Sequence, residues 1–343
     1  MGRVAALLAV VLCGAAFTAC GDDAEPGAPT GATLVLDFQP NAVHSGIYAA
    51  QQRGYFEDEG LDLEIREPSS SADSAKLLEA GRADFAVMDI NDFGIARDSG
   101  LEIVAIAAVV QRPLASVIAA DRDAIRTPAD LEGTTVGVTG VPSDDAVLDT
   151  VLADAGLPPD AVERQTIGFQ AVPLLAAGQL DAATAFWNAE GVQLRAQGVP
   201  TREFRVDEFG APRYPELVIA AAEPPGSPED PRCRLLMGLQ GGYRALEEDP
   251  ADALDAVLDS APALDRAEQE AQMSALLDAR AFSPAFGVGD TNLTAQDDLH
   301  RQRYAPWARW AAQHGIIDSP RIALTGFKSE LQSGGCDGSR PND

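Results

Sequence analysis

Residues 36–65 read LDFQPNAVHSGIYAAQQRGYFEDEGLDLEI and give the clearest indication of the fold of this chain. It begins in an apolar strand, breaks at Pro40-Asn41, and then shows helical spacing of apolar residues until Gly54, after which a second strand follows. The loop over 37–44 is polar, aromatic and rich in turn residues. Because it lies between the end of a buried strand and the start of a helix, it occupies the place where open α/β sheets hold ligands.

A later part of the chain repeats this arrangement. Residues 77–84 read LLEAGRAD and residues 174–181 read LLAAGQLD, in each case a helix end with a glycine that leads into an apolar strand. The strand over 34–36 has a counterpart over 136–138, and each is followed by a loop with a proline and then by a helix. This alternation predicts an α/β protein of two similar lobes, with parallel-rich sheets flanked by helices.

We expect the chain to cross between the lobes twice, near Ala119 and near Tyr214, so that the two crossings form a hinge. The predicted organisation is the first part of lobe one over 32–118, lobe two over 119–213, a return to lobe one with a helical tail over 214–332, and a frayed end over 333–343.

The N-terminal residues have the pattern of an export signal. Arg3 precedes an apolar segment that is too short to span a bilayer, and small residues then lead to Cys20. A cysteine at this place resembles a lipobox, in which residues 1–19 are removed and Cys20 is acylated. Residues 20–31 would then tether the protein to the extracytoplasmic face of the cell membrane. The alternative is a soluble secreted protein with an incidental cysteine.

The chain is strongly acidic, with a formal net charge of −28 at pH 7. Nucleic acid is an unsuitable partner because no basic face is available to bind phosphates. The acidity favours a soluble protein, expected to be a monomer, and disfavours a highly anionic ligand. Two further cysteines, Cys233 and Cys336, could form a disulfide in an oxidising compartment or remain as thiols, since sequence does not give their separation.

Loops at the carboxyl ends of the predicted strands supply the candidate ligand contacts. A planar heteroaromatic ligand needs rings to stack on and a few polar groups in its plane. Trp187 is the preferred stacking ring, and its neighbour Phe186 is assigned to the core. The candidate contacts are Asp37, Phe38, Asn41, His44, Tyr48, Ser70, Asp89, Asn91, Ser143, Trp187, Glu190 and Tyr214.

Several of these candidates could have a structural role instead of contacting a ligand. Trp187 could cap the core of lobe two, Tyr48 could support the pocket from behind, and Asp89 could cap the helix that follows it. His44 could bind the ring or serve as a buried structural group. Ser143 begins a helix that could hold a small oxyanion or a carbonyl group, although two aspartates follow it there.

The run from residue 36 resembles the pyrimidine-precursor binding proteins of bacterial ABC importers, which are relatives of the fungal-type thiamine pyrimidine synthases and of the sulfonate- and nitrate-binding proteins. The family pattern is L-D-W-x-P-N-x-x-H-x-G-x-Y-x-A followed by G-Y-F-x-x-E-G-L-D-V. The residues that match it are Pro40, Asn41, His44, Gly46 and Tyr48, while Phe38 stands in place of the usual tryptophan.

The resemblance extends from about Ala32 to Ser319 and implies a two-lobed, periplasmic-binding-protein-like fold of type II. It also implies a small-molecule ligand, such as a formylamino- or hydroxymethyl-pyrimidine, and partners that are the permease and ATPase subunits of an importer. Riboflavin, an alkylsulfonate or nitrate are alternative ligands on the same fold. A pyrimidine-synthase-type enzyme is a second alternative, which the absence of that family's cysteine-rich cluster opposes.

Sequence signatures of catalysis are lacking. The chain has no G-x-S-x-G elbow, no H-E-x-x-H, no Walker loop and no Cys/His set with metal-ligand spacing. We therefore expect a binding protein without enzyme activity, cofactor or metal.

Overall fold

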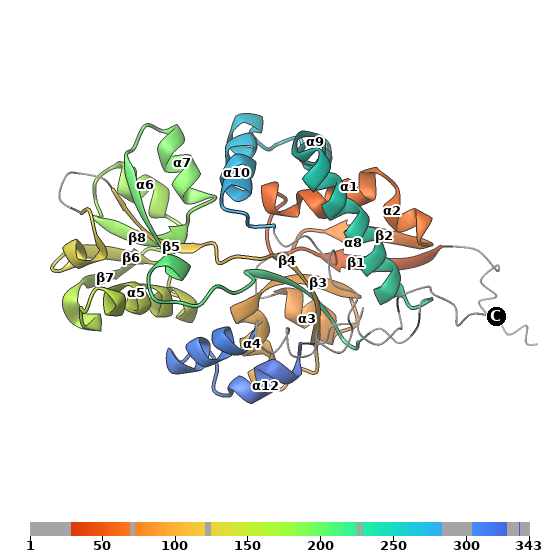
Figure 1. Ribbon diagram of the computed structural model, residues 1–343, viewed down its shortest axis with the longest axis horizontal. Helices are drawn as coiled ribbons and strands as arrows, with labels where there is room; N and C mark the ends of the chain where they lie inside the picture. The colour runs from red at the N-terminus through yellow and green to blue at the C-terminus, as the bar shows by residue number, and fades with distance from the viewer. Residues whose placement is uncertain are drawn as a thin grey trace, which may run out of the picture.

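The computed structural model describes residues 29–68, 73–120, 125–224, 227, 229–282, 304–327 and 336. These residues form two lobes, each built on its own β-sheet, that lie side by side along the long axis of the molecule (Figure 1). We call them the first lobe and the second lobe.

The sheet of the first lobe has strand order β2-β1-β3-β10-β4. The strands β2, β1 and β3 are parallel, and β10 runs antiparallel to both of its neighbours. All five residues of β10 are buried, as expected for a central strand covered on both faces. The bounds are β1 (Thr30–Val35), β2 (Leu61–Arg66), β3 (Phe85–Asp89), β4 (Val104–Val110) and β10 (Leu217–Ala221).

The sheet of the second lobe has the equivalent order β7-β6-β8-β5-β9. Here β7, β6 and β8 are parallel, and β5 takes the antiparallel place that β10 has in the first sheet. The bounds are β5 (Ala115–Ala120), β6 (Thr135–Val138), β7 (Glu163–Thr166), β8 (Ala182–Phe186) and β9 (Thr201–Arg205).

The repeat seen in the sequence corresponds to the same local structure in both lobes. The carboxylate of Asp84 accepts a hydrogen bond from the Thr33 N–H at 2.8 Å, and that of Asp181 accepts one from the Thr135 N–H at 2.9 Å. In each case the aspartate precedes a central strand and binds the strand beside it. The α/β class and the two-lobed, parallel-rich architecture are therefore confirmed.

Helices cover both faces of the sheets. The principal ones are α1 (Ser45–Gln52), α2 (Tyr55–Asp58), α3 (Asp73–Glu79), α4 (Ile90–Asp98), α5 (Pro142–Asp154), α6 (Ala171–Ala176), α7 (Glu190–Ala196), α8 (Pro231–Glu248), α9 (Pro250–Ser260), α10 (Arg266–Asp278) and α12 (Pro320–Thr325). Residues 304–313 are also helical. Short 3-10 turns are η1 (Ala42–His44), η2 (Pro128–Leu131), η3 (Pro159–Ala161) and η4 (Val206–Glu208).

The long helix α8 packs closely against α1, and glycine makes this approach possible. A Cβ atom on Gly242 would lie 2.0 Å from the carbonyl oxygen of Gly46. The start of α8 follows ordinary capping chemistry, because the Asp230 side chain accepts from the Arg232 N–H and Pro231 occupies the first turn.

The chain crosses between the sheets over 111–114 and again over 209–216, which we call the first and second crossings. The first crossing lies earlier than the expected position near Ala119, because β5 already pairs with β8 and β9 of the second sheet. The apolar residues 115–120, which were expected to cross, instead form the inner strand β5 of the second sheet. The second crossing contains Tyr214.

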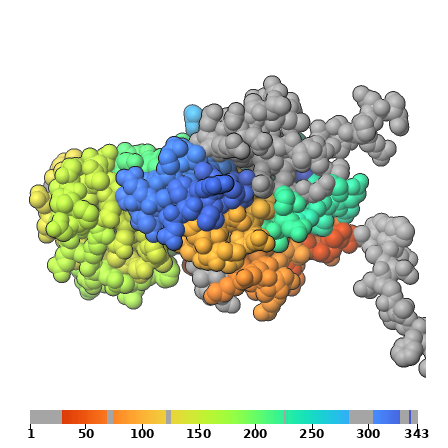
Figure 2. All heavy atoms as spheres, turned by 90° about the horizontal axis from the view of Figure 1, so that it is seen from below, coloured from red at the N-terminus to blue at the C-terminus, as the bar shows by residue number. Residues whose placement is uncertain are grey.

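The C-terminal helices contact both lobes. The indole N–H of Trp310 donates to the Thr150 hydroxyl of α5 at 2.8 Å, and Trp307 packs against α4 at Gly94. One buried apolar cluster contains side chains from both lobes and from these helices. Figure 2 shows the helices, in blue, lying across the second lobe and α4 of the first lobe.

Candidate functional site

The loop after β1 is organised around His44, which is completely buried. The Asn41 N–H donates to its Nδ1 atom at 3.2 Å, and its Nε2 atom lies 2.8 Å from Oδ1 of Asp37. Because Nδ1 accepts, Nε2 carries the ring proton and donates it to Asp37. Both ring nitrogens are thus used within the protein, so His44 positions the carboxylate of Asp37 instead of presenting a free nitrogen to a ligand.

Asn41 completes this loop. Its side-chain oxygen accepts from the Val43 N–H at 3.0 Å, and its amide donates to the Gln39 carbonyl. The next backbone N–H, from Ala42, donates to Oε1 of Gln269 on α10 at 2.9 Å. The loop is therefore fixed before any ligand arrives, as a preorganised binding site requires.

A group of carboxyls lies at the carboxyl end of β3. Asp89 caps α4 by accepting from the Asn91 N–H at 2.6 Å, and its side chain is also hydrogen-bonded to Glu216. Burial raises the pKa of Asp89 and, further, that of Glu216, and the Asp89 charge adds to the effect on Glu216. Two buried carboxyls that are hydrogen-bonded to each other cannot both be ionised cheaply, so the contact favours one shared proton between them.

Asp92 extends this group by one turn of α4. Burial, followed by the charges of Asp89 and Asp37, raises its pKa to about 7. The edge of the first lobe thus offers a mixture of ionised and protonated carboxyls, which can accept from amine or ring N–H groups and donate to ring nitrogens.

Asn91 and Tyr214 are buried beside this edge, and both contact tryptophans of the helix over residues 304–313. The Asn91 side-chain oxygen accepts from the Trp307 indole N–H at 3.0 Å, and both side chains are buried. Tyr214 is 1% exposed and stacks on Trp310 with ring centroids 5.5 Å apart. Burial raises the pKa of the Tyr214 hydroxyl well above its usual value.

In the second lobe, Glu190 and Asp144 lie at the corresponding strand ends. Glu190 accepts from the Phe186 N–H at 3.0 Å, and burial raises its pKa. Asp144 accepts from the Thr139 N–H and hydroxyl and from the Thr184 hydroxyl. The first turn of α5, where Ser143 is half-buried, therefore already holds a carboxylate, which makes it a poor site for an oxyanion.

The two aromatic residues at the end of β8 have exchanged the environments expected from sequence. Trp187 is fully buried, its indole N–H donates to the Pro113 carbonyl at 3.0 Å, and the Arg205 guanidinium lies 4.1 Å from its ring centroid. Phe186 is 41% exposed. The assignment of Phe186 to the core is wrong, because burial decreases along β8 towards its carboxyl end and leaves its last residue exposed. In this conformation Trp187 supports the first crossing and has no free face for stacking.

Large apolar side chains remain exposed where the strands end. Phe38 follows β1 and is 55% exposed, while Val141, Phe169 and Phe186 lie after or at the ends of β6, β7 and β8. Exposed rings at the carboxyl ends of strands lie where α/β sheets hold ligands. Phe38 and Phe186 are thus the candidate stacking rings, one from each lobe.

Of the remaining predicted residues, Tyr48 and the two disulfide cysteines lie within the described part of the chain. Tyr48 is buried on α1, and its pKa is raised to about 12, chiefly by burial and then by the charge of Glu67. Ser70 and Cys20 lie outside the described residues. Cys233 and Cys336 form a disulfide, with their Cα atoms 5.1 Å apart.

Sequence reasoning missed several residues of this site. Glu216 and Asp92 were not singled out, nor were Gln269 and the exposed Phe169. A charged residue directly before a fully apolar strand, as Glu216 stands before β10, was a usable signal. Gln269 gave none, because its contact with Ala42 joins residues that are 227 positions apart.

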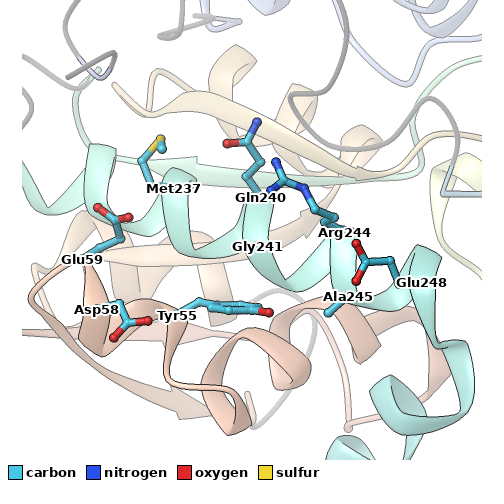
Figure 3. Close-up of a pocket in the computed structure, with 9 residues that line it drawn as sticks. All are labelled: Tyr55, Asp58, Glu59, Met237, Gln240, Gly241, Arg244, Ala245 and Glu248. Atoms are coloured by element: carbon cyan, nitrogen blue, oxygen red, sulfur yellow. The ribbon is translucent and has the colours of Figure 1, made fainter. Parts of the chain in front are cut away.

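A cavity of about 340 Å³ lies elsewhere, between α2 and α8. In Figure 3 the Tyr55 ring lies beneath Gly241, with Asp58 and Glu59 on the side of Met237 and with Arg244 and Glu248 on the other side. None of the predicted site residues lines it.

Within the described ranges, none of the helices has the length and hydrophobicity that spanning a bilayer requires, and no group of three or more His, Cys, Asp or Glu side chains is arranged to hold a metal ion.

Comparison with known proteins identifies the relatives of this chain. The profile of the NMT1/THI5-like family matches residues 41–253. A formylaminopyrimidine-binding protein from Halalkalibacterium halodurans is 30% identical over 306 residues, which cover 86% of this chain and 89% of that protein. The chain belongs to the NMT1/THI5-like family.

Other relatives of this NMT1/THI5-like protein match more distantly. A 4-amino-5-hydroxymethyl-2-methylpyrimidine phosphate synthase from Legionella pneumophila is 26% identical over 177 residues, 52% of this chain and 56% of that enzyme. The alkanesulfonate-binding protein SsuA from Xanthomonas axonopodis pv. citri has a TM-score of 0.61 at 16% identity, with 89% of this chain and all of that chain covered. The second likeness shows the fold alone.

Proposed function

We propose that this NMT1/THI5-like protein binds a small heteroaromatic nutrient between its lobes and delivers it to the permease and ATPase subunits of an ABC importer. The preferred ligand is a thiamine pyrimidine precursor such as a formylamino- or hydroxymethyl-pyrimidine. The relative that matches over most of its length is named for binding formylaminopyrimidine, which supports this choice.

The observation that carries the proposal is the set of carboxyls at the carboxyl end of the first sheet. Asp37 is held by His44, while Asp89 is hydrogen-bonded to Glu216 beside it. An aminopyrimidine has exocyclic amine donors and ring nitrogen acceptors, which suit a site where some carboxyls are ionised and others protonated. Phe38 and Phe186 would supply stacking faces on opposite lobes.

An alkylsulfonate or nitrate suits this site less well. Asp144 occupies the first turn of α5, and the side chains beside the remaining polar groups, Asp37, Asp89 and Glu190, are acidic. None of these residues is cationic. A sulfonate bound beside them would therefore lack a counter-charge, at a cost in electrostatic free energy.

We further propose that the protein acts by binding and not by catalysis, and that acylated Cys20 anchors it outside the cell membrane. The catalytic relatives match about half of the chain, whereas the binding protein matches most of it. The lipobox-like sequence before Cys20 supports the anchor.

The test is native mass spectrometry of the protein purified from the cells that produce it. A retained mass equal to a formylamino- or hydroxymethyl-aminopyrimidine supports the proposal. A retained sulfonate or flavin would assign the fold to a different ligand.

A further inference from the structure

Helix α10 (Arg266–Asp278) belongs to the return of the chain to the first lobe, yet it contacts both lobes. It packs against α7 of the second lobe and against η1 and α9 of the first. Figure 1 shows α10 between α7 and α9, on the opposite side of the crossings from the C-terminal helices.

Two adjacent residues of α10 bind the two halves of the candidate site. Oε1 of Glu268 accepts from the Gln193 amide of α7 at 2.8 Å, and Gln193 lies one turn after Glu190. Oε1 of the next residue, Gln269, accepts from the Ala42 N–H at 2.9 Å, within the loop that holds His44 and Asp37. A shift of α10 would therefore displace its hydrogen-bond partners in both halves of the candidate site.

The other end of α10 is tied to both crossings. The Gln111 N–H donates to the Ala281 carbonyl at 2.6 Å, and Arg112 donates to the Ala279 carbonyl at 3.4 Å, both from the first crossing. From the second crossing, Arg213 donates to the Arg280 carbonyl at 3.2 Å. Arg280 has φ of 52°, a left-handed conformation unusual for a residue with a Cβ atom, so this end of the helix is held in a defined shape.

Among the described residues, the interlobe contact of the C-terminal helices and that of α10 differ in chemistry. On the tail side, the bond from Trp310 to Thr150 lies in a buried apolar cluster, so parting the lobes there would expose aromatic rings. On the α10 side, the bond from Gln193 to Glu268 is polar and only partly buried, and water can replace it. The lobes should therefore separate on the α10 side and pivot about the tail side.

We propose that α10 is an interlobe latch, and that the Gln193–Glu268 hydrogen bond is the contact that closes it and breaks when the lobes open. This inference rests on the proposed function in one respect only, that the two lobes open and close around a ligand. It identifies Glu268 as a positioning residue that holds the closed form without touching the ligand.

The experiment measures the distance between the lobes in the ligand-free protein. Spin labels on cysteines introduced at Glu57 of α2 and Ala176 of α6, both exposed, report the distance distribution by double electron–electron resonance. The variants are Glu268→Ala, Gln193→Ala and the two combined. Glu270→Ala is the matched control. Glu270 is an exposed glutamate on the same helix, and its ion-pair partner, Arg266, also lies on that helix.

Each single variant should raise the ratio of long-distance to short-distance populations about five- to tenfold, the value of one ordinary, partly buried hydrogen bond. The double variant should show no further increase, because either change removes the same bond. Glu270→Ala should match the parent protein. Unchanged distributions in both single variants, or additive effects in the double variant, would overturn the latch.

Circular dichroism separates opening from unfolding, since a latch variant keeps its helix content at the temperature of the measurement. Gln193→Ala lies on a half-exposed helix of the other lobe, so it tests the bond even where Glu268→Ala disturbs α10. Because no ligand is added, the result does not depend on the ligand's identity. Failure of the proposed function would appear in mass spectrometry instead.

Discussion

The Nε2 atom of His44 lies 2.8 Å from Oδ1 of Asp37, and the other ring nitrogen accepts from the backbone of Asn41. This buried imidazole fixes the direction of a carboxylate that is itself partly exposed. The histidine of the sequence pattern therefore supports a candidate ligand contact.

Replacing His44 by Ala should remove both hydrogen bonds and leave Asp37 without its donor. We expect the affinity for the pyrimidine ligand to fall at least about tenfold and the free energy of unfolding to fall by about 1–3 kcal/mol. Titration calorimetry and urea unfolding measure the two effects. Asp62→Asn, an exposed carboxylate on β2, is the control. Unaltered affinity in His44→Ala would show that Asp37 does not contact the ligand.

The exposed ring of Phe186 and the buried ring of Trp187 should respond differently to substitution. Phe186→Ala should weaken ligand binding about five- to tenfold, because a stacked ring contributes on the order of 1 kcal/mol beyond its buried area, and it should leave the melting temperature nearly unchanged. Trp187→Phe removes the donor to the Pro113 carbonyl and should lower stability by about 1 kcal/mol. A loss of affinity in Trp187→Phe alone would return Trp187 to the site in place of Phe186.

The raised pKa of Asp92 predicts that the free energy of unfolding depends on pH. Its pKa is about 7 in the folded protein against 3.8 for the ordinary carboxyl group, so the folded state holds this proton more strongly. The resulting stabilisation is fully present below about pH 4 and is lost as the pH rises through 7. Asp92→Asn should reduce the fall in unfolding free energy between pH 5 and pH 8, measured by urea unfolding. A pH profile identical to that of the parent protein would contradict the raised pKa.

The disulfide between Cys233 and Cys336 ties α8 to the end of the chain across a sequence separation of 103 residues. Cys233→Ser should lower the free energy of unfolding by about 2–4 kcal/mol under oxidising conditions. In the presence of a reducing agent, the parent protein and the variant should have the same stability. Equal differences in both conditions would show that the loss comes from packing and not from the covalent bond.

The strand and helix order could be read from the sequence because local signals agree with the fold. The Leu-Leu-x-Ala-Gly repeat before Asp84 and Asp181 marked the equivalent strands of both lobes, and periodic apolar residues marked the start of α8. The first crossing was placed too late because an apolar strand such as β5 gives no local sign of which sheet it joins. That choice depends on pairing with β8 and β9, which are distant in sequence.

The site was predictable to the level of its loops but not of its side chains. Asp37, Asn41 and Asp89 are at the strand ends where they were expected. Which of Phe186 and Trp187 faces outward depends on the phase of β8, which a short alanine-rich strand does not reveal. The contribution of Gln269 arises from a tertiary contact alone, whereas the position of Glu216 directly before β10 was a signal that could have been used.

Calorimetric titration of the ligand-free protein with formylaminopyrimidine, and in parallel with an alkylsulfonate, is the decisive measurement of which ligand the protein binds. We expect saturable one-to-one binding of the pyrimidine, weakened by Phe186→Ala and by His44→Ala, with no detectable heat from the sulfonate. Binding of the sulfonate and silence toward the pyrimidine would contradict it.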